Sequence, residues 1–556
     1  MKGYEKESFL APLFKMLEAT FELIVPLVVA NIMDIGIKNQ DNAYIWHQCV
    51  IMVLLGVIGL VCALTAQYFS AKAAMGFSTA LRKEMFAHIS KLSYRELDQL
   101  GTPTLVTRIT NDVNQAQTGV NMVLRLFLRS PFIVVGAVIM SFTIDWKIGL
   151  IFLIAVPLIS VVIYAIMRTT VPIYKKAQSS LDRISLITRE NHVGARVVRA
   201  FGRQREEYKE FSQVNDDYTK VQVTAGKISA LLNPATTVIM NFAIIGILWY
   251  GSKEVSIGTL TQGEVVALVN YMNQILIALI ALANLIVAVT KAMASGVRLN
   301  EVLDTQPSLT DEGSSTQQEK AKADRVAFED VSFTYAGSKE PALSHISFTA
   351  KPGETIGIIG GTGCGKSTLV NLIPRFYDAS EGSVVIDGNN AKEYPFSQLR
   401  KKVGMVPQQA VLFKGTIRDN MKWGKEDATE EEIQRALSIA QASDFVNSKP
   451  EGLNTMVSQG GANLSGGQRQ RLTIARALVG DPEILIMDDS ASALDFATDA
   501  ALRHAIHQQT KGMTVFIVSQ RATSIKQADK ILVLDDGELV GVGTHKELME
   551  SCEAYR

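Results

Sequence analysis

The residues best suited to chemistry stand together in one glycine-rich stretch: Gly360, Gly361, Thr362, Gly363, Cys364, Gly365, Lys366, Ser367 and Thr368. Glycines at this spacing let backbone N–H groups curl around a phosphate, and the start of a following helix favours an anion. Lys366 can reach the outer phosphates, and the hydroxyl of Ser367 can ligate Mg²⁺. We interpret Cys364 as a small filler of this loop and not as a redox switch. The stretch therefore predicts a site for a nucleoside phosphate and Mg²⁺.

Two acidic residues, Asp488 and Asp489, follow an apolar run at Ile484–Met487. A carboxylate at the end of a strand beside a phosphate-binding loop is suited to hold Mg²⁺, directly or through water. We assign this role to Asp488, which places it with Ser367 in the predicted metal site.

The elements that must position these residues are short β runs that alternate with helical stretches. The expected strands are Thr355–Ile359, Ser383–Ile386, Ile484–Met487, Thr514–Val518 and Lys530–Leu534. This alternation predicts an α/β domain with a largely parallel sheet over residues 325–556. The segment before it, residues 306–324, is polar and is expected to be a linker.

The chain before the linker, residues 1–305, holds nearly all the long apolar runs. A helix needs about 20 mostly apolar residues to cross a bilayer. Six runs qualify: Ala11–Ile37, Cys49–Ala71, Val120–Thr143, Ile148–Met167, Leu231–Gly251 and Val265–Val289. Lys and Arg are concentrated in the two long connecting segments, Lys72–Gly119 and Arg168–Ala230. The positive-inside rule therefore predicts a multi-pass protein of the cell membrane with both termini and the α/β domain in the cytoplasm.

The long connecting segments are expected to be helical, because they are rich in helix-forming residues and lack clusters of Gly and Pro. The spans would continue as helices into the cytoplasm and turn near Gly101–Thr107 and Ala200–Tyr208. Two interpretations of these tips stay open. They are either solvated charged surfaces, or they dock on the soluble domain and transmit force.

Polar residues occur within the apolar spans. Asn270, Asn273 and Gln274 share one face of the sixth span, because they are three and four residues apart, and Asn241 lies in the fifth. Polar groups in lipid are costly and tend to face a bundle interior or a wet cavity. These four residues are therefore candidates for a substrate cavity, with interhelical hydrogen bonding as the alternative.

Glu18 and Glu22 on the first span are equally unusual in lipid. The polar positions of the spans are scattered along the sequence, and no cluster of membrane charges is evident. This pattern favours amphipathic drugs, lipids or lipopeptides as cargo over small hydrophilic ions.

Composition argues against a nucleic-acid-binding protein and against a disulfide-rich or cysteine-metal protein. Basic and acidic residues number 55 each, and this zero net charge gives no support to nucleic-acid binding. The four cysteines have neither metal-ligand spacing nor a dense framework, so free thiols are expected.

A further motif, Leu464, Ser465, Gly466, Gly467 and Gln468, lies between the glycine-rich loop and Asp488. With this motif the chain resembles the ATP-binding cassette (ABC) family, whose signature is LSGGQ. Six spans fused ahead of one cassette resemble a half-transporter of the multidrug exporter type, over nearly the whole chain. The resemblance implies a six-helix transmembrane domain of the ABC exporter type, an α/β P-loop ATPase domain, and the use of ATP and Mg²⁺.

The resemblance also assigns roles to further residues. Tyr335 resembles the aromatic residue that stacks on adenine, and Gln408 resembles the Q-loop glutamine near Mg²⁺ and the attacking water. The family's D-loop is resembled by Ser492, Ala493, Leu494 and Asp495. In this family two cassettes meet head to tail, and each ATP lies between the P-loop of one and the signature of the other. A second half-transporter in the surrounding membrane lipid is therefore expected.

Two positions depart from the family pattern, and both concern hydrolysis. The residue after the metal-binding Asp is usually Glu and here is the shorter Asp489; the switch position is usually His and here is Gln520. Gln520 can hydrogen-bond a phosphate but cannot become cationic. A misplaced base can forfeit roughly 10²–10⁴-fold in rate. The catalytic set of this P-loop (Asp489, Gln520 and Gln408) is therefore expected to hydrolyse slowly.

A chain that keeps the ATP-binding residues and the signature but has altered hydrolysis residues resembles the degenerate-site subunit of a heterodimeric exporter. Such a subunit holds ATP at its own P-loop and lends its signature to a partner that carries the Glu and the His. Two alternatives stay open: a symmetric homodimer that hydrolyses ATP at both sites, and an ABC-type sensor or channel regulator without cargo.

Overall fold

The computed structural model describes residues 3–311, 313, 324–490, 493–510 and 512–556. The described residues form two compact units. The helical unit comprises the chain up to Ile89 together with Pro103–Asp304. The α/β unit comprises Ser90–Thr102 together with Thr305–Arg556, so a short segment from the first half of the chain folds with the second half.

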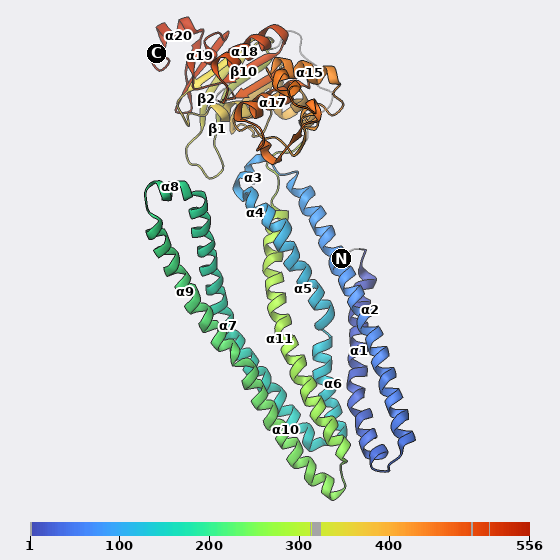
Figure 1. Ribbon diagram of the computed structural model, residues 1–556. Coiled ribbons are helices and arrows are strands. Elements are labelled where there is room, and N and C mark those ends of the chain that lie inside the picture. The colour runs from blue at the N-terminus through green and yellow to red at the C-terminus, as the bar shows by residue number, and fades with distance from the viewer. Residues whose placement is uncertain (1–2, 312, 314–323, 491–492, 511) are drawn as a thin grey trace. The chain divides into compact units, whose positions relative to one another are not determined.

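Six helical segments of the described chain are long and apolar enough to cross a membrane, which confirms the six predicted spans (Figure 1). They are Glu5–Ile37, Asn42–Ile89, Thr102–Ile144, Trp146–Val193, Gln204–Ile257 and Gln262–Asp304. At about 1.5 Å per residue, the 48 residues of Trp146–Val193 extend roughly 72 Å, more than twice the thickness of a bilayer core. The helices therefore continue well beyond their apolar stretches.

The helices of this unit are α1 (Glu5–Asn31), α2 (Asn42–Ile89), α4 (Thr102–Thr107), α5 (Val113–Leu126), α6 (Arg129–Ile144), α7 (Trp146–Val193), α8 (Ala195–Ala200), α9 (Gln204–Ala230), α10 (Leu232–Ile257) and α11 (Gln262–Asp304). π-helical turns follow α1 and α4, at Ile32–Ile37 and Arg108–Asp112. The start of α7 is fixed by Asp145, whose carboxylate accepts hydrogen bonds from two backbone N–H groups at 2.8 Å.

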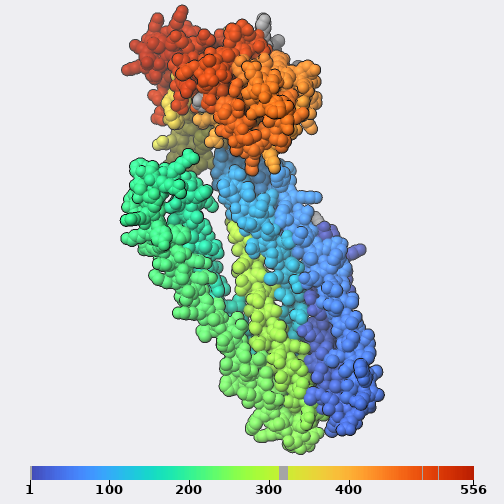
Figure 2. Space-filling view, viewed as in Figure 1, coloured from blue at the N-terminus to red at the C-terminus, as the bar shows by residue number. Residues whose placement is uncertain are grey.

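The centre of the helical unit is α11, which packs against α1, α5, α6, α7 and α10. Leu268, Tyr271 and Met272 of α11 are fully buried, and the Tyr271 hydroxyl donates a hydrogen bond to the Leu23 carbonyl of α1 at 2.7 Å. In the space-filling view, the paired α7 and α9 (green) stand apart from α11 toward their α8 end (Figure 2).

The α/β unit contains a six-stranded sheet in the order β12-β11-β3-β10-β9-β6. Its strands are β3 (Thr355–Gly360), β6 (Val403–Val406), β9 (Ile484–Asp488), β10 (Thr514–Val518), β11 (Lys530–Asp535) and β12 (Glu538–Gly543). Only the β11–β12 pair of this sheet is antiparallel. Every residue of β9 and β10 is buried, as expected for parallel strands that are covered on both faces.

A four-stranded antiparallel sheet, β2-β1-β4-β5, packs beside it around a shared apolar core. Its strands are β1 (Val326–Phe333), β2 (Leu343–Ala350), β4 (Glu381–Ile386) and β5 (Asn389–Asn390). The predicted strand Ser383–Ile386 is therefore part of this antiparallel sheet. A small ladder pairs β7 (Gly415–Thr416) with β8 (Met456–Val457).

The helices of the α/β unit are α3 (Tyr94–Leu100), α12 (Lys366–Leu372), α13 (Phe396–Lys402), α14 (Ile417–Lys422), α15 (Glu430–Ile439), α16 (Ser443–Asn447), α17 (Gly466–Leu478), α18 (Phe496–Gln509), α19 (Ala522–Ile525) and α20 (His545–Ser551). Helix α12 follows β3 directly, which is the strand–loop–helix arrangement that the glycine-rich stretch requires.

Each connecting tip turns twice, once before the predicted stretch and once within it: Gly101 separates α3 from α4, and residues 201–203 separate α8 from α9. The first contains α3, which begins after a capping box in which the Ser93 N–H donates to the Glu96 carboxylate at 3.0 Å. The second contains α8, at Ala195–Ala200.

Candidate functional site

The carboxyl ends of four neighbouring parallel strands, β3, β10, β9 and β6, meet at one edge of the large sheet. Ligands of such sheets bind at this edge. β3 runs into the glycine-rich loop, β9 into Asp488 and Asp489, β10 into Gln520, and β6 into Gln408. Val518, the last residue of β10, pairs with Ile358 on one side and with Asp488 on the other. Sheet register thus brings four separate motifs together.

A cavity of about 390 Å³ lies at this edge. The predicted residues that line it are Tyr335, Thr362, Gly363, Gly365, Lys366, Ser367, Thr368, Gln408, Asp488, Asp489 and Gln520. Gly360, Gly361 and Cys364 form the loop but are not among its lining residues, and Cys364 is buried behind it. Sequence reasoning missed Ala342, Val518 and Ser519, which also line the cavity. Ser519 could have been predicted from the sequence, because it directly precedes Gln520.

The glycine-rich loop has a backbone path that side chains would block. A Cβ at Gly360 would lie 2.1 Å from the Leu534 carbonyl oxygen, and a Cβ at Gly365 would lie 2.6 Å from that of Ala342. Gly365 also has a left-handed backbone, with φ of 91°. The Lys366 ammonium is buried in the loop and donates to the Gly360 carbonyl at 2.9 Å. The loop therefore places a cation and successive backbone N–H groups around one point.

The predicted metal residues are in direct contact. The Ser367 hydroxyl donates to Oδ1 of Asp488 at 3.0 Å. Burial raises the pKa of Asp488, and the charge of the adjacent Asp489 raises it further. A buried carboxylate, a hydroxyl and the nearby Gln408 amide are oxygen donors of the kind that Mg²⁺ prefers, and a cation would relieve the charge of the buried carboxylate. The residues present fit Mg²⁺.

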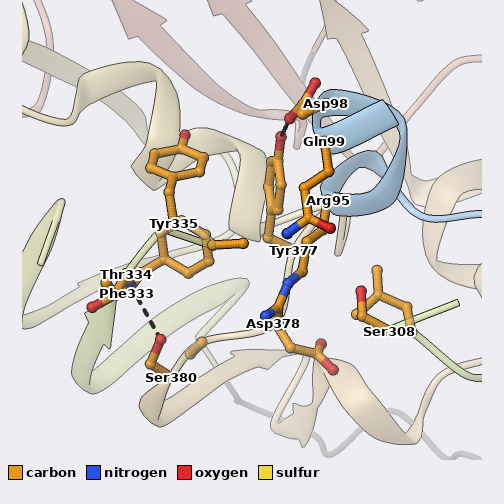
Figure 3. Close-up of a pocket in the computed structure, with 13 residues that line it drawn as sticks. Arg95, Asp98, Gln99, Ser308, Phe333, Thr334, Tyr335, Tyr377, Asp378 and Ser380 are labelled. Carbon is orange, nitrogen blue, oxygen red and sulfur yellow. Dashed lines mark hydrogen bonds between the residues drawn. The ribbon is translucent and has the colours of Figure 1, made fainter. Parts of the chain in front are cut away.

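Tyr335 follows β1 and also lines the cavity. Its hydroxyl is hydrogen-bonded to that of Thr368 at 2.9 Å, and its side chain is partly exposed. Its ring meets Phe333 and Tyr377 edge-on, with centroid distances of 4.8 and 5.5 Å (Figure 3). A partly exposed aromatic ring held in this way can stack on a planar base.

The two departures from the family pattern face the same cavity. Asp489 has a left-handed backbone, with φ of 43°, and its N–H donates to the Val518 carbonyl at 3.0 Å. Its backbone is thereby fixed against β10, and its carboxylate is one methylene shorter than that of Glu. Gln520 is exposed at the end of β10. The residues predicted to bind phosphate and the two that depart from the pattern therefore line one cavity.

The signature motif lies at the start of α17 and forms a capping box. The Ser465 N–H donates to Oε1 of Gln468 at 3.0 Å, and the Gln468 N–H donates to the Ser465 hydroxyl at 3.3 Å. Ser465 and Gly466 are exposed, while Leu464 is buried. Of the described residues, Leu464, Ser465, Gly466, Gly467 and Gln468 contribute nothing to the lining of the P-loop cavity. The signature therefore lies outside this cavity and begins α17 with two exposed residues.

The predicted D-loop lies beside the signature. A Cβ at Gly467 would lie 3.3 Å from the Ala493 carbonyl oxygen. Leu494 is buried, and Asp495 caps α18 by accepting from the Thr498 N–H at 2.8 Å. Hydrogen bonds from Thr498 lower the pKa of Asp495. Ser492 lies outside the described residues.

Charged side chains meet inside the helical unit, so the expectation of no membrane charge cluster was wrong. The guanidinium of Arg129 on α6 donates to the Glu22 carboxylate at 2.8 Å and lies 3.8 Å from that of Glu18. The Lys15 ammonium donates to the Glu18 carboxylate at 2.6 Å. Arg129 and Glu22 are 107 positions apart, and only helix packing reveals their proximity.

The four predicted cavity residues differ in burial and in their hydrogen-bond partners. The Gln274 amide donates to the Glu22 carbonyl at 3.2 Å, and its Oε1 is buried without a hydrogen-bond partner among the described residues. Asn273 is exposed and bonds to Val269 of its own helix, Asn241 is exposed, and Asn270 is half-buried.

A separate cavity of about 450 Å³ lies between α7 and α11. It is lined by Ser160, Ile163, Tyr164, Met167, Arg168, Val171, Pro172, Leu279, Leu282, Ala283 and Ile286. Its apolar lining carried no signal in the sequence beyond ordinary helix hydrophobicity, and it includes none of the four predicted residues.

Comparison with known proteins gives matches over the whole chain. Residues 8–279 match the family model of the ABC transporter transmembrane region, and residues 343–492 match that of the ABC transporter. YfiB of Bacillus subtilis (strain 168), an uncharacterized ABC transporter ATP-binding protein, is 37% identical over 556 residues, which is 100% of this chain and 96% of that protein. An ATP-dependent lipid A-core flippase of Desulfotalea psychrophila is 35% identical over 469 residues, which is 84% of this chain and 82% of that protein. The solved structure of a bacterial Atm1-family ABC exporter shares the fold, with a TM-score of 0.81 at 24% identity, and the match covers 100% of this chain and 97% of that one.

Proposed function

This chain is an ABC exporter half-transporter, a multi-pass membrane protein with an ATP-hydrolysing domain, and we propose that it is the degenerate-site subunit of a heterodimer. One observation carries the proposal. The P-loop cavity keeps Lys366, Ser367 and Asp488, which bind the phosphates and the metal, but has Asp489 and Gln520 where hydrolysis needs a longer base and a histidine.

The residues of this cavity suit prolonged ATP binding. Tyr335 would stack on the adenine, and Lys366 with the loop N–H groups would hold the β- and γ-phosphates. Ser367 and Asp488, with Gln408, would hold a Mg²⁺ ion, which supplies charge neutralisation at the phosphates when bound. The Asp489 carboxylate, one methylene shorter than that of Glu, would reach less far toward an attacking water.

The exposed start of α17 supports a role at a second ATP. Ser465 and Gly466 present a hydroxyl and backbone N–H groups at the N-terminus of a 13-residue helix, an arrangement that suits a γ-phosphate. In the proposed dimer this phosphate belongs to ATP on the partner's P-loop. The partner would carry the Glu and the His that this chain lacks.

The helical unit supports export of an amphipathic cargo. The apolar cavity between α7 and α11 has Arg168 and Tyr164 in its lining, which suits a molecule with an apolar body and a polar end. The charged group around Arg129 and Glu22, with the unpartnered Gln274 oxygen, offers a second polar contact. The name of the Desulfotalea relative, a lipid A-core flippase, supports a lipid-like cargo.

We further propose that both termini and the α/β unit lie in the cytoplasm, because the long connections are rich in Lys and Arg. The α8 tip would dock on a cassette and transmit its motion. Val197 and Phe201 at this tip are 60% and 76% exposed, which is unusual for apolar side chains that remain in water.

Co-purification from the native host, followed by ATPase measurement, tests the proposal. We expect a second half-transporter with Glu and His at the two altered positions, slow hydrolysis by the isolated chain, and restored hydrolysis in the complex. Recovery of a single chain type with brisk turnover would establish the symmetric homodimer instead.

A further inference from the structure

We propose that a groove between α18 and α19 on the α/β unit is a regulatory site for a small phosphorylated molecule with an apolar body. The groove is separate from the P-loop cavity, because no described residue lines both. The inference goes beyond the proposed function and applies equally to a heterodimer and to a homodimer.

The groove is large enough for a small molecule and has an apolar floor. Its volume is about 490 Å³, within the range of small-molecule sites. The floor is formed by side chains of the large sheet, Met487 of β9 with Val515 and Ile517 of β10, each no more than 8% exposed. The walls come from α18 and α19 (Figure 1). A flat or hydrocarbon body would pack on this floor.

Arg503 holds the two walls together. Its guanidinium donates to the Thr523 and Ser524 carbonyls of α19 at 3.0 and 2.9 Å. It also donates to the Asp499 carboxylate at 2.8 Å, one turn before it on α18. The frame of the groove is thus built from the protein's own contacts, and the charge of Arg503 is balanced within the wall.

Three other basic side chains line the groove without a partner in the described chain. His504 and His507 are three residues apart on α18 and share a face, and Lys526 directly follows α19. All three are exposed, and their side chains form no hydrogen bond or ion pair with the residues that the structure describes. Asp and Glu are absent from the described lining. The groove therefore offers hydrogen-bond donors and positive charge to an anion.

The carboxylates that adjoin the lining residues in sequence are already held by the protein. Asp499 is bonded to Arg503, and the Asp529 carboxylate accepts a hydrogen bond from the Thr355 N–H at 2.8 Å. Neither forms an ion pair with Lys526 in the described chain. The ammonium of Lys526 therefore remains available to a ligand.

The chemistry of the groove identifies the class of ligand. A phosphate monoester carries about 1.5–2 negative charges at pH 7 and presents three strong acceptor oxygens. An ammonium is a common phosphate binder, and imidazole N–H groups donate to the same oxygens. A carboxylate has one charge and two acceptor oxygens, so it uses these donors less fully. A phosphomonoester with an apolar or aromatic body matches both the basic side chains and the floor.

The place of the groove gives its ligand an influence on ATP hydrolysis. Helix α18 begins directly after Asp495 of the predicted D-loop, and α19 begins two residues after Gln520. A ligand that contacts both helices stabilises one relative position of them, and a cycle that must leave that position becomes slower. We therefore expect the bound phosphomonoester to lower ATP turnover.

Phenyl phosphate is the probe, because it joins an aromatic body to a phosphate. Its binding to the full-length complex in lipid nanodiscs is measured by isothermal titration calorimetry, with the P-loops occupied by a non-hydrolysable MgATP analogue. Phenol and inorganic phosphate, titrated separately, each supply one half of the probe. ATP turnover is measured as ADP formation with and without phenyl phosphate.

Four kinds of variant separate the charge of the groove from other effects. Lys526→Met removes the charge at nearly constant length, and Lys526→Arg keeps it. His504→Gln and His507→Gln test the two imidazoles. Lys546→Met is the matched control, because Lys546 is an exposed lysine on α20 outside the groove. All of these side chains are exposed, so every variant should fold like the parent.

We expect Lys526→Met to bind phenyl phosphate at least about tenfold more weakly than the parent, because a hydrogen bond to a charged group is lost. Lys526→Arg and Lys546→Met should stay within about fivefold of the parent, and each His variant should lose about three- to tenfold. Phenol and inorganic phosphate should each bind at least about tenfold more weakly than phenyl phosphate. Saturating phenyl phosphate should lower ADP formation by at least about threefold in the parent, and much less at the same concentration in Lys526→Met.

Equal binding by the parent and Lys526→Met would overturn the proposal, as would the absence of saturable binding by the parent. Binding that leaves ADP formation unchanged would also overturn it, because the site would then regulate nothing. Tighter binding of a glutamate hexapeptide than of phenyl phosphate would assign the groove to an acidic peptide and overturn the proposal. None of these outcomes depends on which chain hydrolyses ATP, so the proposed function is tested separately.

Discussion

Gly466 offers the sharpest test of which ATP site this chain serves. It is the first residue of α17, it is exposed, and a Cβ there would have no other heavy atom within 4 Å. Alanine is favoured over glycine in a helix by about 1 kcal/mol. Gly466→Ala should therefore leave the chain folded and at least as stable as the parent, so a loss of ATPase activity cannot come from misfolding.

The magnitude of the loss follows from what the added methyl group would displace. In the proposed dimer, the backbone N–H groups of this turn donate to the γ-phosphate of the partner's ATP. Loss of one hydrogen bond to a charged group amounts to about 1.5–3 kcal/mol. At 25 °C this corresponds to a fall of roughly 10–160-fold in hydrolysis by the complex.

Asp489→Asn is the companion variant. In the proposed heterodimer the Asp489 carboxylate is too short to act as an efficient base, so its loss should change hydrolysis by the complex by less than about threefold. Both variants are assayed by phosphate release from the co-purified complex at saturating MgATP. Gly226→Ala serves as the matched glycine control, because it is also exposed in a helix with open space around a Cβ.

The opposite ordering would refute the reasoning. If Asp489→Asn removed most of the activity while Gly466→Ala left it intact, the P-loop of this chain would perform the chemistry. The cavity would then be an active site in spite of its altered residues.

Three further predictions follow from the same contacts. In the isolated chain, Asp489→Glu combined with Gln520→His should raise ATP turnover by about 10–100-fold, measured by phosphate release, because the base and the switch residue are restored. Burial raises the pKa of Asp488, so the folded protein is stabilised by the protonated carboxyl in acid and loses this stabilisation as the pH rises. Without nucleotide, Asp488→Asn should therefore raise the melting temperature at pH 7, and the melting temperatures of variant and parent should converge below about pH 4. The variant should also lose the stabilisation that MgATP gives the parent. Arg129→Met should destabilise the helical unit by about 2–3 kcal/mol, because Glu22 loses its cation but is 40% exposed, and adding Glu22→Gln should recover part of this in thermal unfolding.

Much of the nucleotide site could be predicted because its residues follow strands. Asp488 follows an apolar run directly, and Gln408 and Gln520 lie two residues after one. Lys366 is joined to its strand by the glycine-rich loop. Parallel strands bring such positions to one edge, whatever their separation in sequence. The six spans were predictable for a similar reason, since bilayer thickness sets a minimum length for an apolar helix.

Contacts between distant side chains could not be predicted in this way. The proximity of Arg129 and Glu22 depends on how α6 is rotated against α1, and the rotation follows from close packing along both helices. The Tyr377 hydroxyl donates to the carboxylate of Asp98, 279 positions away, and neither residue belongs to a motif. The apolar cavity between α7 and α11 depends on small differences in helix separation that the hydrophobic pattern does not encode.

The membership of Ser90–Thr102 in the α/β unit has a consequence for how the protein is made. This segment leaves the ribosome before four of the six spans exist, whereas its docking surface at Phe376 and Tyr377 comes much later. At a synthesis rate of roughly 5–20 residues per second, about half a minute passes between the synthesis of α3 and that of its docking surface. During that interval Tyr94 and Ser93 have no partners on the α/β unit. A chain that terminated after the last span would leave this segment without the docking surface that it has in the complete fold.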